Sequence, residues 1–338
     1  MTAYFNPYVL IHVDNQVIIA IYIDNITMVG PNTAKREELK KVLQAEFQLS
    51  DLRPLNWLLG IQIEWRDNNS ATLSQQIYID QILLRFRMDT CNPVHLPLNP
   101  SIKLLKAQGS DDLADVSRYQ QIIGSLMYLV IGSRPDLVFT VSALSQFASK
   151  PTKEHMGVLK QVLRYLKSTR DLKLTYTKST DNQLTLVGYS DADYGGDRND
   201  WKSTTGNIFQ IAGNTICWRS VKQRCVSTST VEAEYIALST TAKQQLWLQN
   251  ALNELHIDIS AAALQTDNNG TIDLTNNPCI SDKSKHIDIA YHHVRDLVET
   301  GKINLLHVPS KDNLANINTK ALPSPQFLYL REQVLGRQ

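Results

Sequence analysis

Three acidic residues in the second half of the chain stand where a rigid backbone could hold them. Asp191 follows the apolar run 184–190, whose pattern predicts a strand. Asp267 follows a second predicted strand that ends at Thr266, so it repeats this strand-end position. Glu234 lies near the start of a predicted helix. Two of the acids share the strand-end position and the third begins a helix, so the three acids, from separate elements, could converge on one edge of a sheet.

The helix that carries Glu234 also carries Glu232, and two residues of separation point these side chains to different faces. Glu234 lies four residues before Leu238, on the apolar stripe, so we expect it rather than Glu232 to face the sheet. Asp193 follows closely after the first acid. Whether Asp193 or Glu232 joins the ligands stays open at this point.

Convergent carboxylates of this kind suit phosphodiester cleavage assisted by divalent cations. Such a site needs several hard oxygen ligands that hold two ions about 3.5–4 Å apart, one activating water and one stabilising the leaving oxygen. The plainer alternative is that acids at strand ends are solvated turn formers, while acids at helix starts interact favourably with the helix dipole. The spacing alone leaves both alternatives open.

The elements that would position these acids form an α/β layer after residue 181. The pattern predicts three strands, a long helix, a strand, two helices, a strand and a final helix. The expected ranges are 184–190, 206–211, 215–221, 230–255, 262–266, 268–276, 286–300, 303–308 and 313–320. An antiparallel meander followed by alternating helices and strands indicates a mixed sheet.

The first part of the chain has a strand pattern, and the middle part has a helical one. Strands are expected over 8–13, 17–23, 26–29 and 57–65, with one helix over 33–47. Turns are expected at Asp14-Asn15, Asp24-Asn25 and 67–69. Further helices are expected near 77–86, 119–131, 136–148 and 153–167. The chain is therefore expected to hold more than one compact unit.

Basic residues gather in two places. On the predicted helix 153–167, three recur at i, i+4 and i+7 beside an apolar stripe: Lys160, Arg164 and Lys167. Near the end of the third strand of the last unit stand three more: Arg219, Lys222 and Arg224. Both sets could contact nucleic-acid phosphates. The alternatives are a solvated helix face for the first set and edge-strand charges that block aggregation for the second.

The totals agree with a globular protein of 338 residues, 43% hydrophobic and 20% charged. No apolar run approaches the roughly 18 residues of a spanning helix, and the first residues lack the basic start of a signal peptide. We therefore expect an intracellular protein with no membrane partner. The four cysteines lie far apart without zinc-site spacing, so we expect reduced thiols. The net charge of +1 neither suggests nor excludes a nucleic-acid partner.

Several short motifs are spread along the chain. They read LSQQIY at 73–78, GSLMYL at 124–129, SRPDL at 133–137, VLRYLK at 162–167, YSDADY at 189–194, KSTTG at 202–206, EAEY at 232–235 and KHIDI at 285–289. In order and spacing, from about Tyr8 to Leu335, they resemble the C-terminal part of the Pol polyprotein of copia-type LTR retrotransposons. The resemblance is specific because so many matches are collinear.

The resemblance implies an α/β and α+β multidomain protein. Residues 1–72 would be a remnant of a reverse-transcriptase palm, made of hairpins, and residues 73–180 a mostly helical thumb and connection. Residues 181–322 would form a ribonuclease H-like domain with a mixed five-stranded sheet and helices. Residues 323–338 would be a C-terminal tail.

The resemblance also assigns roles in the last unit. Asp191, Glu234 and Asp267 look like the metal-binding carboxylates of a ribonuclease H site, which would take two Mg²⁺ or Mn²⁺ ions and cleave the RNA of an RNA–DNA hybrid. The family has a fourth acid in a Leu-Ala-Asp context, where this chain has Leu314-Ala315-Asn316. A neutral amide at Asn316 would hold one ion with less negative charge and therefore more weakly. We expect impaired ribonuclease activity.

The polymerase motif departs from the family pattern as well. A Tyr-x-Asp-Asp turn is expected to hold two carboxylates, and this chain has Tyr22-Ile23-Asp24-Asn25. Asp24 keeps one catalytic carboxylate, whereas Asn25 is an amide. The resemblance places another polymerase aspartate in the palm upstream of Tyr8, so we expect this chain alone not to polymerise DNA.

Two functions follow as alternatives. The first is an enzyme fragment whose surviving chemistry is ribonuclease H cleavage, and the second is a non-catalytic relic or co-opted nucleic-acid-binding protein. The implied partner is an RNA–DNA hybrid or a template–primer duplex. A homodimer, or association with a complete reverse transcriptase, is a further expectation. The implied location is the cytoplasm, within a virus-like particle, or the nucleus.

Overall fold

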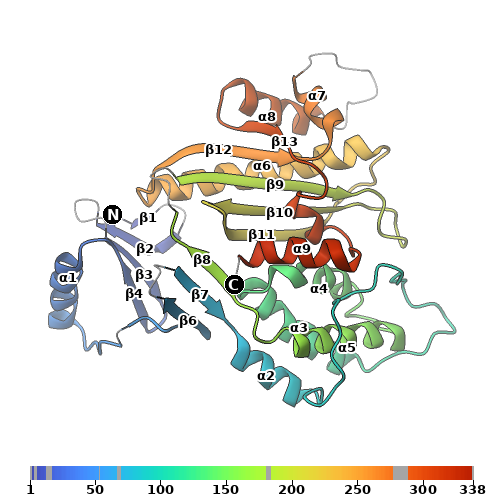
Figure 1. The fold of residues 1–338 in the computed structure, drawn as a ribbon, viewed down its shortest axis with the longest axis horizontal. Helices are drawn as coiled ribbons and strands as arrows, with labels where there is room; N and C mark the ends of the chain where they lie inside the picture. Colours follow the sequence, from blue (N-terminus) through green and yellow to red (C-terminus); the bar gives the residue numbers. More distant parts are fainter. Residues whose placement is uncertain are drawn as a thin grey trace.

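The chain forms two small antiparallel sheets, a group of helices and a five-stranded mixed sheet (Figure 1). The computed structural model describes residues 2–3, 6–12, 17–52, 54–66, 70–179, 184–276 and 288–336. The turns expected at 14–15 and 67–69 lie outside these residues, as does the start of the 285–289 motif.

The N-terminal unit is an antiparallel sheet followed by one helix. Its elements are β1 (Thr2–Ala3), β2 (Asn6–His12), β3 (Val17–Tyr22), β4 (Asn25–Val29) and α1 (Thr33–Glu46). The strands pair in chain order. Asn32 caps α1, because its Oδ1 accepts a hydrogen bond from the Lys35 amide at 3.1 Å. The turn between β3 and β4 consists of Ile23 and Asp24, with Tyr22 opposite Asn25, so Asn25 already belongs to a strand.

A second antiparallel sheet joins segments that are far apart in the sequence. Its strands, in spatial order, are β5 (Trp57–Leu58), β6 (Ile61–Arg66), β7 (Ser70–Ser74) and β8 (Leu174–Thr177). β8 pairs with β7 from Leu73 and Leu174 to Ser70 and Thr177. The chain therefore returns, after the helices, to the strand that precedes them. Sequence analysis did not predict β8.

The helices between β7 and β8 pack around one core. They are α2 (Gln76–Arg85), α3 (Val116–Gly132), the 3₁₀ turn η2 (Pro135–Leu137), α4 (Val138–Ser145) and α5 (Lys153–Ser168). The helix expected over 136–148 is thus a 3₁₀ turn followed by a shorter helix. α5 starts with a capping box, in which Thr152 and His155 bond each other's backbone amides.

The last unit is built on the mixed sheet. Its elements are β9 (Leu184–Asp193), β10 (Thr204–Ile211), β11 (Asn214–Lys222), α6 (Thr230–Glu254), β12 (Ile259–Thr266), α7 (Asn269–Asn276), α8 (Asp288–Glu299), β13 (Asn304–His307) and the 3₁₀ helix η3 (Leu314–Asn318). The strand order is β11-β10-β9-β12-β13; the first three are antiparallel, and β12 runs parallel to both β9 and β13. The expected fold class is confirmed. The final helix expected over 313–320 is instead the short 3₁₀ helix.

Different layers cover the two faces of this sheet. The long helix α6 packs on β9, β10 and β12, while η3 packs on β9 and β10 (Figure 1). Residues 324–335, which sequence analysis left in a tail, form α9 (Ser324–Leu335) beside β11 and η3. Phe327, Leu330 and Val334 of α9 are buried in the same core as α2 to α5. One continuous core therefore joins the helices to the mixed sheet.

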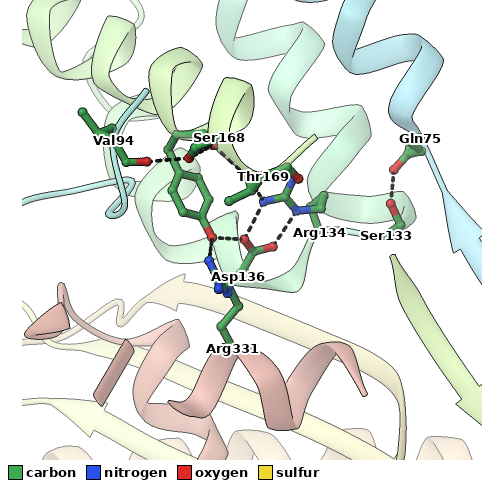
Figure 2. Close-up of polar contacts among 9 residues, drawn as sticks. Gln75, Val94, Ser133, Arg134, Asp136, Ser168, Thr169 and Arg331 are labelled. Carbon is green, nitrogen blue, oxygen red and sulfur yellow. Dashed lines mark hydrogen bonds and ion pairs between the residues drawn. The ribbon is translucent and has the colours of Figure 1, made fainter. Parts of the chain in front are cut away.

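A buried polar network crosses that same junction (Figure 2). The Arg134 guanidinium makes a bidentate ion pair with Asp136, with Nε–Oδ1 and Nη2–Oδ2 distances of 2.9 and 2.7 Å, and both side chains are 0% exposed. Arg134 also donates to the Thr169 carbonyl and hydroxyl. The Tyr165 hydroxyl donates to Asp136 at 2.7 Å, and Arg331 of α9 donates to that hydroxyl at 3.3 Å. The SRPDL motif thus fixes α5 and α9 together.

Candidate metal centre

Three of the predicted site residues lie together at one end of the mixed sheet. Asp191 at the end of β9, Glu234 in the first turns of α6 and Asp267 directly after β12 each offer a carboxylate oxygen, and these oxygens lie within 4.8 Å of one another. Asp191 is 2% exposed and Glu234 is 6% exposed, while Asp267 is half-buried. In the part of the chain that the structure describes, no other group of His, Cys, Asp and Glu meets this distance criterion.

The sheet topology explains why these acids meet. β9 and β12 are parallel neighbours, with Tyr189 opposite Gln265, so their C-terminal ends reach the same edge. Glu234 is buried, whereas Glu232 is half-buried and accepts hydrogen bonds from the Thr228 amide and hydroxyl. Glu234 rather than Glu232 therefore faces the sheet, as the helical pattern predicts.

Crowding of buried carboxylates shifts their titration. Burial raises the pKa of Asp191, and the charge of Asp267 raises it further, while Lys320 and a hydrogen bond from Thr319 oppose the rise. Burial, followed by the charges of Asp191 and Asp267, raises the pKa of Glu234 to about 9. Burial and mutual repulsion therefore disfavour ionisation of all three carboxyl groups together, and a bound cation would relieve that repulsion.

The segment around η3 supports two of the acids. The Thr319 hydroxyl donates a hydrogen bond to Asp191 Oδ2, and Lys320 Nζ lies 3.5 Å from the same oxygen. Asn313 Nδ2 donates to Asp267 Oδ1 at 3.2 Å and to the Ser190 carbonyl at 2.9 Å. Sequence reasoning missed these three supporting residues. One feature of the sequence could have indicated them, because all three lie within four residues of Asn316, a predicted site residue.

The donor atoms fit a divalent cation. Glu234 Oε2 and Asn316 Oδ1 are buried and have no hydrogen-bond partner among the described residues. Asn316 Nδ2 donates to the Ser310 carbonyl at 2.8 Å, which leaves the oxygen as the free atom of that amide. Carboxylate and amide oxygens are the ligands that Mg²⁺ and Mn²⁺ prefer. Bound cations would give these orphaned oxygens the partners that they lack.

A glycine lets η3 come close to the acids. Gly206 on β10 lies opposite Asp191 on β9. A Cβ atom on Gly206 would lie 2.6 Å from Thr319 Cγ2 and 2.8 Å from the Ala315 carbonyl oxygen. The glycine of the KSTTG motif is therefore required by backbone approach, since η3 could not pack here against a larger residue.

The polymerase turn lies elsewhere and holds a single acid. Asp24 and Asn25 are both exposed, and the search for clustered metal ligands among the described residues finds no group at this turn. Ile23 has a φ of 50°, a left-handed conformation that β-branched residues rarely adopt. The tight hairpin is thus formed, and Asn25 stands where the resemblance predicts the second carboxylate.

The predicted basic residues have different surroundings. On α5, Lys160 is exposed, whereas Arg164 Nε donates to the Asn92 carbonyl at 2.7 Å and Lys167 Nζ donates to the Asp89 carbonyl at 2.5 Å. Two of the three α5 residues therefore hold the loop that follows α2.

On β11 and after it, Arg219 and Arg224 are exposed. Lys222 instead forms ion pairs with Asp197 and, at 2.8 Å, with Asp200. These two acids compete with any phosphate for the Lys222 ammonium.

A mixed sheet in this strand order, with acids at the shared ends of two parallel strands and on the covering helix, is the arrangement that the sequence resemblance predicts for a ribonuclease H-like unit. The chain also matches the family model "Reverse transcriptase (RNA-dependent DNA polymerase)" over residues 3–100. Within the described residues, no helix combines the length and apolar character needed to cross a bilayer.

Relatives and a solved structure agree with the match to the reverse transcriptase family. The Pol polyprotein of transposon TNT 1-94 from Nicotiana tabacum is 35% identical over 95% of this chain and 24% of its own length. The putative transposon Ty5-1 protein of Saccharomyces cerevisiae is 32% identical over 68% of this chain and 74% of its own length. A foamy viral protease–reverse transcriptase in complex with double-stranded DNA shares the fold with a TM-score of 0.51, at 15% identity, over 86% of this chain and 46% of that one.

The chain belongs to the family of Pol polyproteins of copia-type retrotransposons, which confirms the resemblance read from its motifs. It spans 21% to 24% of the length of the plant Pol polyproteins that it matches.

Proposed function

We propose that this chain carries the ribonuclease H function of a copia-type Pol polyprotein and hydrolyses the RNA strand of an RNA–DNA hybrid with the help of Mg²⁺ or Mn²⁺. The observation that carries the proposal is the convergence of Asp191, Glu234 and Asp267 within 4.8 Å. The family membership supports the substrate class.

Each side chain has a separate part in this proposal. Asp191, Glu234 and Asp267 would hold two cations, which when bound would activate the attacking water and stabilise the leaving oxygen. Thr319 and Lys320 orient the Asp191 carboxylate, and Asn313 orients Asp267. These groups keep the carboxylates in place before substrate binds, so little reorganisation is needed.

Asn316 lowers the activity in this proposal without abolishing cation binding. Its buried, unpartnered Oδ1 can serve as a ligand, but it brings no negative charge. A cation held by fewer charged ligands is bound more weakly, so a smaller fraction of the chain carries both cations at a given metal concentration.

The polymerase half is proposed to bind the duplex without extending it. Asp24 is an isolated exposed carboxylate, and Asn25 replaces the acid that would share a cation with it. The template–primer or hybrid duplex as partner, the division at residues 72, 180 and 322, and association with a second copy or a complete reverse transcriptase stay predictions. So does the location in the cytoplasm, within a virus-like particle, or in the nucleus.

A second function, nucleic-acid binding without cleavage, is favoured by the amides at both sites. Asn25 and Asn316 each stand where the family pattern has a carboxylate. A non-catalytic relic or a co-opted binding protein would keep the fold and the exposed basic residues while losing the chemistry.

Cleavage of an end-labelled RNA–DNA hybrid separates the two functions. We expect slow cleavage by the natural chain with Mn²⁺ or Mg²⁺, faster cleavage by Asn316→Asp, and none by Asp191→Asn. If Asn316→Asp binds the hybrid in a salt-sensitive manner but never cleaves it, the binding function replaces the enzymatic one.

A further inference from the structure

A cavity of about 200 Å³ lies directly beside the metal centre. Its walls come mainly from the loop between β9 and β10, helix α4 and the linker that follows α2, and residues of β10, of β11 and of the segment after η3 complete them. Phe139 of α4, Leu104 of the linker and Asp193 at the end of β9 all line it. Sequence analysis left Asp193 without a role.

The cavity has more cationic than anionic groups in its wall. Lys103, Arg198, Lys222 and Lys320 line it together with Asp193 and Asp197. Lys222 is already paired with Asp197 and with Asp200, which is outside the cavity. Lys320 lies 3.5 Å from Asp191 Oδ2, so Lys103 and Arg198 face the one remaining carboxylate of the wall, that of Asp193, and the wall keeps more cationic than anionic side chains.

Hydrogen bonds hold together the two segments that carry Lys103 and Arg198, the linker after α2 and the β9–β10 loop. Asn199 Nδ2 donates to the Leu104 carbonyl at 3.1 Å, and the Lys106 amide donates to Asn199 Oδ1 at 2.7 Å. These bonds tie the linker to the β9–β10 loop. Ser220 also lines the cavity, and its side chain is buried, with an Oγ that makes no hydrogen bond to the described residues.

The cavity adjoins the three acids through residues that they share or that neighbour them on β9. Asp191 and Asp193 are two residues apart on β9, so their side chains lie on the same face, about 7 Å apart along the strand. Lys320 belongs to both the cavity and the acidic group, since it lines the cavity and its Nζ also lies 3.5 Å from Asp191 Oδ2. A polymer whose backbone passed the acids would therefore bring its next charged groups to this cavity.

We propose that the cavity is a phosphate subsite that binds a backbone phosphate of the nucleic acid near the phosphodiester at the metal centre, with Lys103 and Lys320 as its charged ligands. The proposal deepens the ribonuclease H function and rests on it. Cationic side chains around a cavity of about 200 Å³, which has room for a phosphate group, suit this ligand. The linker of the helical unit thereby completes a binding surface of the sheet unit.

Hybrid binding without divalent cations tests the proposal, because no cleavage can occur. Lys103→Met is compared with the natural chain, and Lys106→Met is the matched control, since Lys106 is exposed on the same linker but does not line the cavity. A series of hybrids each carries one uncharged methylphosphonate linkage at a different position in either strand.

We expect Lys103→Met to weaken binding of the unmodified hybrid by about tenfold and to reduce the slope of log affinity against log salt by about one. In the natural chain and in Lys106→Met, one methylphosphonate position should cause a similar loss. In Lys103→Met, that same position should cause no additional loss, because the partner lysine is already gone. This non-additivity identifies the contacted phosphate.

The outcomes separate the subsite from the proposed function. If the natural chain binds and cleaves hybrid but Lys103→Met behaves like Lys106→Met, the subsite is wrong and the function stands. If no variant cleaves hybrid while the methylphosphonate effect depends on Lys103, the subsite stands and the function is wrong. A thermal shift with inorganic phosphate or adenosine monophosphate that depends on Lys103, without any sensitive linkage, assigns the cavity to free phosphate compounds and overturns the backbone assignment.

Discussion

Lys320 holds its ammonium group 3.5 Å from Oδ2 of Asp191, a carboxylate whose residue is 2% exposed. The same oxygen accepts a hydrogen bond from Thr319. The Lys320 charge also lowers the pKa values of Asp193 and Glu234 against the rise caused by burial. One lysine thus supplies positive charge to a group of acids that would also attract a divalent cation.

Replacing Lys320 by Met should therefore strengthen cation binding. The ammonium and a divalent cation repel each other, so its removal should lower the dissociation constant for Mn²⁺ by about tenfold, or roughly 1.4 kcal/mol. Without metal the variant should melt at a lower temperature, since Asp191 loses a stabilising charge. Calorimetric titration with Mn²⁺ and Mg²⁺ measures the affinity, and Lys311→Met is the control, because Lys311 is an exposed lysine of the same segment. Weaker binding by Lys320→Met would show that the lysine assists the cation.

Asn313 is expected to position Asp267, beyond its role as a helix cap. Its Oδ1 caps η3 through the Ala315 amide, while its Nδ2 bonds both Asp267 and the Ser190 carbonyl. Asn313→Ser keeps a capping oxygen and loses the amide donors, so it should bind Mn²⁺ several-fold more weakly with a small loss of stability. Asn313→Ala loses the cap as well, which should cost about 1 kcal/mol more in the free energy of unfolding. Titration and urea unfolding distinguish the two effects; equal Mn²⁺ affinity in Asn313→Ser and the natural chain would contradict the positioning role.

Gly206 should not tolerate a side chain. The groups that its Cβ would meet include the backbone carbonyl of Ala315 and the Cβ of Asn318, which cannot move unless η3 moves. Gly206→Ala should lower the free energy of unfolding by about 1–3 kcal/mol, as overpacking does, and should weaken cation binding by displacing Thr319. Gly124→Ala is the matched control: it lies within α3 with nothing near its Cβ, so it should be neutral or stabilising. Unfolding curves that coincide for Gly206→Ala and the natural chain would exclude close packing of η3.

The sequence predicted the acids of the metal centre because their positions follow from local rules. A strand predicted to end at Ser190 or Thr266 puts the next acid near the sheet edge, although β9 in fact continues to Asp193, and helical periodicity separates Glu234 from Glu232. The supporting residues Asn313, Thr319 and Lys320 follow no such rule. Their contacts depend on how η3 packs on β9 and β10, which no local pattern specifies.

Long-range pairing limited the rest of the fold prediction. β8 is a strand because it meets β7 about a hundred residues earlier, and four residues alone carry too little pattern to predict that pairing. The C-terminal helix α9 is similar, since its apolar residues are explained only by the core formed with α2 to α5. Spacing placed Arg164 and Lys167 on one helix face with Lys160, but it could not show that carbonyls of a neighbouring loop would bind them.

The buried pair of Arg134 and Asp136 should control the stability of the junction between α5, α9 and the helices around them. Burial alone would raise the pKa of Asp136, but the charge and hydrogen bonds of Arg134, together with the Tyr165 hydroxyl, outweigh it and hold that pKa below its usual range. A depressed carboxyl pKa stabilises the fold above the pKa of the unfolded state, about 3.9, and this contribution is lost as the pH falls below that value. The natural chain should therefore lose stability below about pH 4 through this group, whereas Asp136→Asn should show a weaker pH dependence there.

Arg134→Met tests the pair at neutral pH. It leaves Asp136 buried without its partner, so the free energy of unfolding should fall by about 3–5 kcal/mol. Arg134→Met combined with Asp136→Leu removes both charges and should recover much of that loss, because the uncompensated charge rather than the missing pair is what destabilises. Urea unfolding followed by circular dichroism measures each value. Lys153→Met is the control, since Lys153 and Asp112 form an exposed ion pair, with side chains 71% and 77% accessible, whose loss should change little. A double variant no more stable than Arg134→Met would mean that the network acts through its hydrogen bonds to Thr169 and Tyr165 instead.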